Sequence, residues 1–173
     1  MSNELGNVEP KVEAYRSRLD KAQGFNELWE IVKHTVKDSL GEYRSGMLLF
    51  LDDLPLQLGA YHPVGTNNIV LNRALVSIVE TATRSRSLVN AFVYSLLTHE
   101  YLHALGHMPE DEVHHLVHRV SRECFGDDHT VTRLAEESPW SLLRGVPLGR
   151  VEVSRGGMEV VKDFEKPSQR YII

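Results

Sequence analysis

The segment from Ser87 to Leu105 constrains the fold of this chain more than any other part of the sequence. It reads SLVNAFVYSLLTHEYLHAL, with apolar residues on nearly every face of a helix, so we expect a helix buried on all sides. Gly106 follows directly and is suited to end that helix. His99, Glu100 and His103 lie in its final turns, where buried polar side chains need partners. The sequence therefore predicts a central helix with a polar site near its carboxyl end.

These three polar residues form the pattern HEYLH, which has the spacing of a zinc site. His99 and His103 are four positions apart, so a helix can direct both imidazoles at one point. Glu100 lies beside that point, where its carboxylate can take a proton from a zinc-bound water whose pKa the metal lowers towards ~7. The pattern predicts zinc held by His99 and His103, with Glu100 as the catalytic base.

A catalytic zinc ion needs a third protein ligand and keeps one position open for water and substrate. In metzincins this ligand is a histidine three residues after the glycine, but here that position is Pro109. Glu112 lies in the opening turns of the following helix, close to the short GHMP connection, and is our predicted third ligand. Glu123, farther along that helix, and His107, where the chain is still turning, are the alternatives.

The rest of the sequence predicts a mixed α+β fold in which residues 1–173 form one domain. Apolar residues recur at helical spacing over Phe25–Leu40 and indicate an amphipathic helix. Short apolar runs bounded by turn residues predict a strand in GMLLFLDDL and a hairpin or meander in LGAYHPVGTNNIVLN. RVEVSRGGMEVV has the pattern of a C-terminal hairpin. Further helices are expected in VEAYRSRLDKA, in ALVSIVETATRS, from Pro109 to Gly126, and from Asp127 to about Glu137.

Composition limits the classes of function and partner. The formal net charge is -5, which argues against a nucleic-acid partner, because phosphate binding needs clustered lysine and arginine. No apolar run reaches the roughly 18 residues of a membrane-spanning helix, so we expect no membrane partner. Cys124 is the one cysteine, and MSNELGNVEP lacks the pattern of a signal peptide. These features favour a cytoplasmic protein.

With HEYLHALG and the helical segment EDEVHHLVHRVSRECFG, the chain resembles a zincin metallopeptidase, and more narrowly the small archaeal minigluzincins. The resemblance covers residues 25–126 and leaves residues 138–173 as a C-terminal extension. It implies a small mixed sheet packed on the HExxH helix, followed by a glutamate-bearing helix. It also implies that Asn68–Leu71 binds extended peptide by main-chain pairing, and that the apolar ending YII can cover the cleft in a latent form.

These observations lead to three hypotheses. The first is a zinc-dependent metallopeptidase that acts on peptides or unfolded protein, with zinc held by His99, His103 and Glu112 and water activated by Glu100. The second is a non-catalytic or self-inhibited zinc protein whose cleft is closed, for example by self-association. A zinc hydrolase that acts on a substrate other than peptide is a weaker third hypothesis, since the low basic charge argues against RNA.

Overall fold

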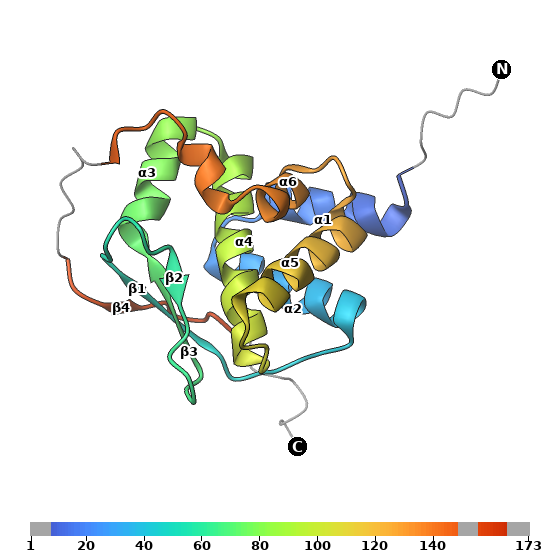
Figure 1. Cartoon of the computed structure of the whole chain (residues 1–173), viewed down its shortest axis with the longest axis horizontal. Helices are drawn as coiled ribbons and strands as arrows, with labels where there is room; N and C mark the ends of the chain where they lie inside the picture. Colours follow the sequence, from blue (N-terminus) through green and yellow to red (C-terminus); the bar gives the residue numbers. More distant parts are fainter. Residues whose placement is uncertain (1–7, 149–155, 166–173) are drawn as a thin grey trace.

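The computed structural model describes residues 8–148 and 156–165 and has the mixed α+β architecture that the sequence predicts (Figure 1). The helix predicted over Phe25–Leu40 is confirmed with those bounds, and every other predicted helix is present within a few residues of its expected bounds. The elements in chain order are α1 (Pro10–Lys21), α2 (Phe25–Leu40), β1 (Leu48–Asp52), β2 (Ala60–Tyr61), β3 (Asn68–Asn72), α3 (Arg73–Thr83), α4 (Arg86–Ala104), α5 (Glu110–Phe125), α6 (Thr130–Glu136), a 3-10 helix (Pro139–Leu143) and β4 (Glu159–Val160).

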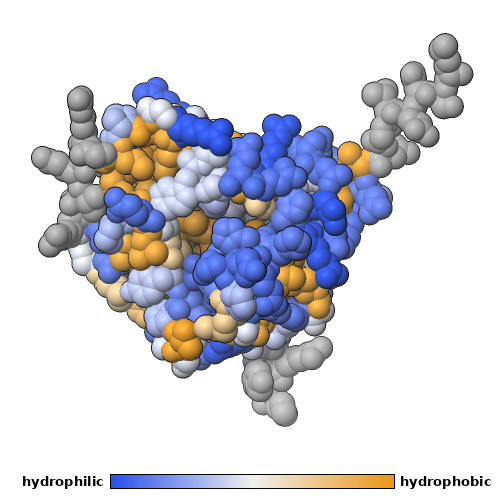
Figure 2. All heavy atoms as spheres, in the orientation of Figure 1, coloured by the Kyte–Doolittle hydropathy of each residue, from blue (hydrophilic) through white to orange (hydrophobic). Residues whose placement is uncertain are grey.

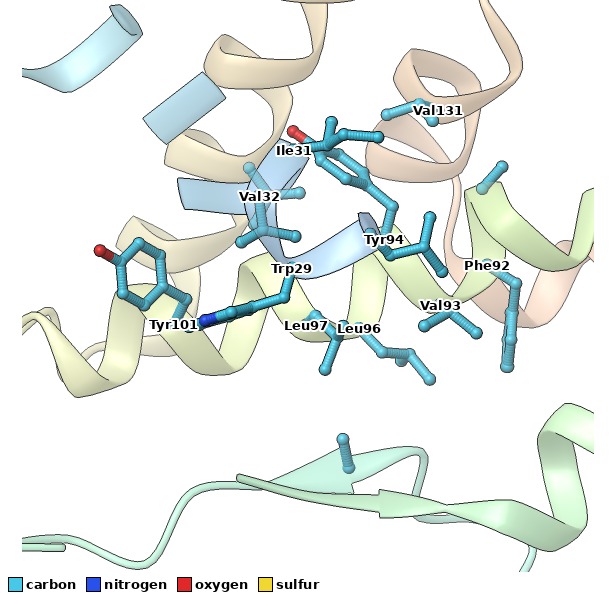
Figure 3. Close-up of a cluster of buried hydrophobic side chains, with 14 of the residues drawn as sticks. Trp29, Ile31, Val32, Phe92, Val93, Tyr94, Leu96, Leu97, Tyr101 and Val131 are labelled. Atoms are coloured by element: carbon cyan, nitrogen blue, oxygen red, sulfur yellow. The ribbon is translucent and has the colours of Figure 1, made fainter. Parts of the chain in front are cut away.

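Helix α4 is the centre of the structure, as its apolar sequence predicts. It packs against all five other α-helices and against β2 and β3, so residues on every side of it are buried. Ser85 caps the start of the helix by accepting a hydrogen bond from the Leu88 N–H. Figure 3 shows how α2 crosses it, with Trp29 lying against Tyr101 at a ring-centroid distance of 4.9 Å. Tyr101 is one of the two variable positions of HEYLH, so this packing holds the motif in the core.

The sheet lies on one side of α4 and has the strand order β2-β3-β1-β4. β1 and β3 are parallel, in a register that pairs Leu49 with Ile69, whereas β2 and β3 form the predicted antiparallel hairpin. Val70 and Leu71 of β3 are paired on both sides, so the expectation that Asn68–Leu71 binds peptide by main-chain pairing is wrong for these two residues. The edge strand on that side of the sheet is β2.

The C-terminal segment extends the far edge of the sheet and completes the core. β4 pairs antiparallel with β1, and Phe164 is 2% exposed and stacks on Trp29 at 4.7 Å. Glu165 accepts hydrogen bonds from Trp29 Nε1 at 3.1 Å and from the Gly46 N–H at 2.5 Å. The first strand of the predicted C-terminal hairpin and the YII tail lie outside the described residues. The described part of the extension is thus integrated into the core formed by the preceding helices.

Helix α5 has the amphipathic pattern that the sequence predicts, and its buried stripe includes Val113, Val117 and Val120. The opposite side carries histidines and charged residues, and Figure 2 shows a mainly hydrophilic surface where α5 lies. α6 begins three residues later than predicted, because the imidazole of His129 rather than Asp127 or Asp128 caps it, accepting from the Val131 N–H. Among the described helices, none has the length and apolar character needed to cross a membrane.

Candidate metal centre

Three side chains converge where α4 ends and α5 begins. His99 and His103 project from α4, and Glu110 is the first residue of α5. One possible ligand atom from each lies within 4.8 Å of the other two. Glu110 Oε2 is 3.0 Å from His99 Nε2, and Glu110 Oε1 is 2.7 Å from His103 Nε2. We call these three residues the His-His-Glu cluster.

The turn between the two helices brings Glu110 to the histidines. Gly106 adopts a φ of 106°, a conformation that suits glycine, and the His107 N–H donates to Leu102 O at 3.1 Å. Pro109 is extended, with φ −66° and ψ 130°, and is the N-cap residue of α5. The chain therefore reverses within the five residues 105–109, and the first side chain of the new helix faces the last turns of the old one.

The hydrogen bonds of His103 suit a metal ligand. Its Nδ1–H donates to the carbonyl oxygen of His107 at 2.8 Å, so in the neutral imidazole the lone pair that a metal needs is on Nε2. Nε2 is the nitrogen that faces Glu110. Metal-binding histidines usually make such a bond from the second nitrogen, which fixes the tautomer and the ring orientation.

The charges of the cluster also fit a divalent cation. Burial lowers the pKa of His99, and the nearby His103 and His114 lower it further, although Glu110 opposes them. A neutral imidazole is the form that binds metal. Burial opposes ionisation of Glu110, but the neighbouring imidazoles outweigh it and lower the pKa of this carboxyl. Two imidazoles and one carboxylate form a ligand set found in catalytic zinc sites, so the residues fit zinc.

Glu100 lies beside this cluster but is buried, with 8% of its surface exposed. Burial raises its pKa to about 7, partly offset by His103 and by a backbone hydrogen bond from His62. The side chain borders a pocket of about 240 Å³, together with His99 and His114. The other walls are largely apolar and include Leu58, Leu96, Val117, Leu134, Pro139 and Trp140. The arrangement places a proton-accepting group at an apolar cavity next to the cluster.

The structure does not bring Glu112 to the two histidines. Glu112 is two residues beyond Glu110, about 200° further around the helix, and its Oε1 lies 3.0 Å from His107 Nδ1. Glu123 accepts hydrogen bonds from Ser39 and Arg119. Glu110 stood among the acidic residues of this helix in the sequence, and its place directly after Pro109 is the signal that could have identified it.

Two further histidines, His107 and His114, lie near the cluster. His107 contacts Glu42 through Nε2, at 2.8 Å, and Glu112 through Nδ1, and these carboxylates raise its pKa. His107 is therefore engaged with these carboxylates and is not one of the three residues whose possible ligand atoms converge. The ring of His114 lies 5.2 Å from that of His99, and its Nε2 is 3.7 Å from Glu110 Oε2.

Comparison with protein-family models, with curated proteins and with solved structures gives no match to this chain.

Proposed function

We propose that this protein is a zinc-dependent peptidase of the zincin type, in which His99, His103 and Glu110 hold the metal. Glu110 replaces Glu112 in this proposal because it is the carboxylate that lies within 4.8 Å of both imidazoles. The observation that carries the proposal is that buried Glu100 lies beside the His-His-Glu cluster and lines the same largely apolar pocket as His99.

When bound, zinc would act as a Lewis acid that polarises a carbonyl and lowers the pKa of a water ligand towards ~7. The protein residues supply the remaining chemistry. The carboxylate of Glu100 accepts the proton of the attacking water and later donates it to the leaving amine, a role typically worth about 10²–10⁴-fold in rate. Burial holds the pKa of Glu100 at about 7, which suits a group that both accepts and donates a proton near neutral pH.

The surroundings of Glu100 favour peptide as the substrate. The apolar walls of the pocket suit a hydrophobic side chain of an unfolded or extended segment. Gly59 and Ala60, at the β2 edge of the sheet, line the same pocket, and an extended peptide can add to such an edge. The net charge of -5 disfavours a polyanionic substrate.

A comparison of Glu100→Gln with the wild-type protein tests this function. Both are loaded with zinc, and cleavage of fluorescently labelled, heat-denatured casein is followed alongside zinc content by elemental analysis. We expect the variant to retain one zinc ion and to lose about 10²–10⁴-fold in cleavage rate. Glu123→Gln changes a glutamate bound to Ser39 and Arg119, and as a matched control it should cleave normally. Equal cleavage by Glu100→Gln and wild type would reject the mechanism.

One observation favours a second candidate function, a non-catalytic zinc protein with a closed site. His114 is close enough to Glu110 to be a fourth protein donor, which would leave no open position for substrate. The zinc affinity of His114→Ala distinguishes the two candidate functions. If His114 is a fourth ligand, the variant should lose much of its zinc affinity, and if the fourth position is open, the affinity should hardly change. His115→Ala is the control, because His115 is an exposed neighbour on the same helix.

A further inference from the structure

His107 lies in the turn between α4 and α5 and is held there by contacts on both sides of its ring. Both of its ring nitrogens contact carboxylates, Glu42 at 2.8 Å and Glu112 at 3.0 Å, and only 20% of its side chain is exposed. The two partners are far apart in the sequence. Glu42 lies between α2 and β1, whereas Glu112 lies in the first turn of α5. We call Glu42, His107 and Glu112 the His107 clamp.

The backbone of the same residue supports the proposed metal ligand. The carbonyl oxygen of His107 accepts the hydrogen bond from His103 Nδ1, at 2.8 Å. The His107 N–H is bonded to Leu102 O, so the peptide units on either side of this residue are tied to α4. The side chain of His107 and the tautomer of His103 are thus connected through one residue of the turn.

The segment that presents Glu42 is itself attached to the HEYLH helix. Tyr101 OH accepts from the Arg44 N–H at 2.7 Å and donates to Arg44 O at 3.1 Å. Arg44 Nη1 donates to Ala104 O at 2.7 Å, at the carboxyl end of α4. The backbone two residues after Glu42 is therefore attached to α4, which positions Glu42 to anchor His107.

We propose that the His107 clamp is a positioning device that orients His103 and the first turn of α5 for metal binding. This inference rests on the proposed metal centre. Holding His107 fixes its carbonyl, and the carbonyl directs the His103 ring so that Nε2 faces the metal position. Holding Glu112 fixes the turn of α5 that carries Glu110, two residues earlier. His107, Glu42 and Glu112 contact no metal and act through the ligands.

A clamp that only stabilises the fold would not change metal affinity in the folded protein. The distinguishing measurement is therefore the zinc dissociation constant, obtained by competition with a chromophoric chelator well below the unfolding temperature. His107→Ala keeps the backbone carbonyl, so a change in affinity reports how that carbonyl is oriented. We expect affinity to fall by about 10-fold or more, within the range typical of outer-shell partners.

The chain offers a matched control in the pair His118 and Glu136, whose Nε2 and Oε1 atoms lie 3.1 Å apart on α5 and α6. His118→Ala and Glu136→Ala remove a similar imidazole–carboxylate contact away from the cluster and should leave zinc affinity unchanged. Glu42→Ala is the second clamp variant, because Glu42 lies 57 residues before His99 and outside the turn. It should weaken zinc binding in the same direction, and the Co²⁺ absorption bands of both clamp variants should shift.

Equal zinc affinity of His107→Ala and His118→Ala, with unshifted Co²⁺ bands, would overturn the clamp while leaving the metal centre intact. A wild-type protein that takes up no zinc overturns both the clamp and the proposed function. A wild-type protein that binds zinc but cleaves no casein rejects the peptidase function alone, and the affinity comparison still decides the clamp. Circular dichroism spectra of all variants establish that the folded proteins are being compared.

Discussion

Two clusters of histidine and carboxylate lie at the end of α4, and they differ in the direction of their nitrogens. In the His-His-Glu cluster, two imidazoles direct Nε2 at one carboxylate, so three ligand atoms surround a common point. In the His107 clamp, one imidazole directs its two nitrogens at two carboxylates on opposite sides. The first arrangement can hold a cation, and the second can only join two segments of chain.

The comparison shows that residue type alone does not identify a metal site. Both clusters contain histidine and glutamate, and both are partly exposed. The deciding feature is whether the ring nitrogens of different residues converge on one point. His103 and His99 both direct Nε2 at Glu110, whereas the two nitrogens of His107 contact two separate carboxylates.

The largest effect is expected from His103→Ala, which removes one of the converging nitrogens. Zinc affinity should fall by more than the roughly 10–100-fold that loss of an outer-shell partner costs, because a direct ligand is lost. Zinc content after dialysis and chelator competition measure the change. His115→Ala, which alters an exposed histidine of α5, should bind zinc as the wild type does. If His103→Ala loses no more zinc affinity than His107→Ala does, His103 does not act as a direct ligand and the two clusters do not differ in function.

The second-largest effect is a difference in zinc affinity between variants of Glu110 and Glu112, two glutamates of α5. Glu110→Ala should weaken zinc binding beyond the outer-shell range, while Glu112→Ala should weaken it by no more than about 10-fold, through the His107 clamp. Because the Glu110 side chain is 66% exposed, its removal should barely change the free energy of unfolding of the metal-free protein. The reverse order of zinc affinities would restore Glu112 as the ligand, as the sequence alone predicts.

Most of the fold could be predicted from periodicity and composition. The continuous apolar pattern of Ser87–Leu105 indicated a buried helix, and the helical spacing in Phe25–Leu40 gave that helix with its observed bounds. Both signals are local, because they depend on which faces of one element are apolar. The HEYLH pattern is also local, since two histidines one helical turn apart must lie on one face.

The third ligand could not be chosen in this way because it depends on how two helices meet. Periodicity assigns Glu110 and Glu112 to different faces of α5 but does not say which face turns towards α4. The conformations of Gly106 and Pro109 settle this, since they fix the first residue of α5 and the direction of its axis. The interior position of β3 is a similar case, because its parallel pairing with β1 joins two strands that are not consecutive in the chain.

The smallest expected effect is a change of folding stability with pH. It shows whether the His107 clamp depends on a charged imidazole or on hydrogen bonds between neutral groups. Glu42 and Glu112 raise the pKa of His107 above its ordinary value near 6.5, so the folded protein binds this proton more tightly than the unfolded chain does. The stabilisation is therefore fully present below about pH 6.5 and is lost as pH rises through the raised pKa. Both carboxylates are more than a third exposed, so we expect only about 0.5–1 kcal/mol.

Urea unfolding of metal-free wild type and His107→Gln at pH 5.5 and pH 9 measures this contribution, with a chelator present so that zinc does not contribute. The wild type should exceed the variant by more at pH 5.5 than at pH 9, because only the protonated imidazole carries the charge that both carboxylates attract. Glutamine keeps a polar side chain of similar reach but does not titrate, so the difference between the two pH values isolates the charge of His107. A stability difference that is constant with pH would mean that neutral hydrogen bonds hold the clamp. A difference that grows towards pH 9 would contradict the raised pKa itself.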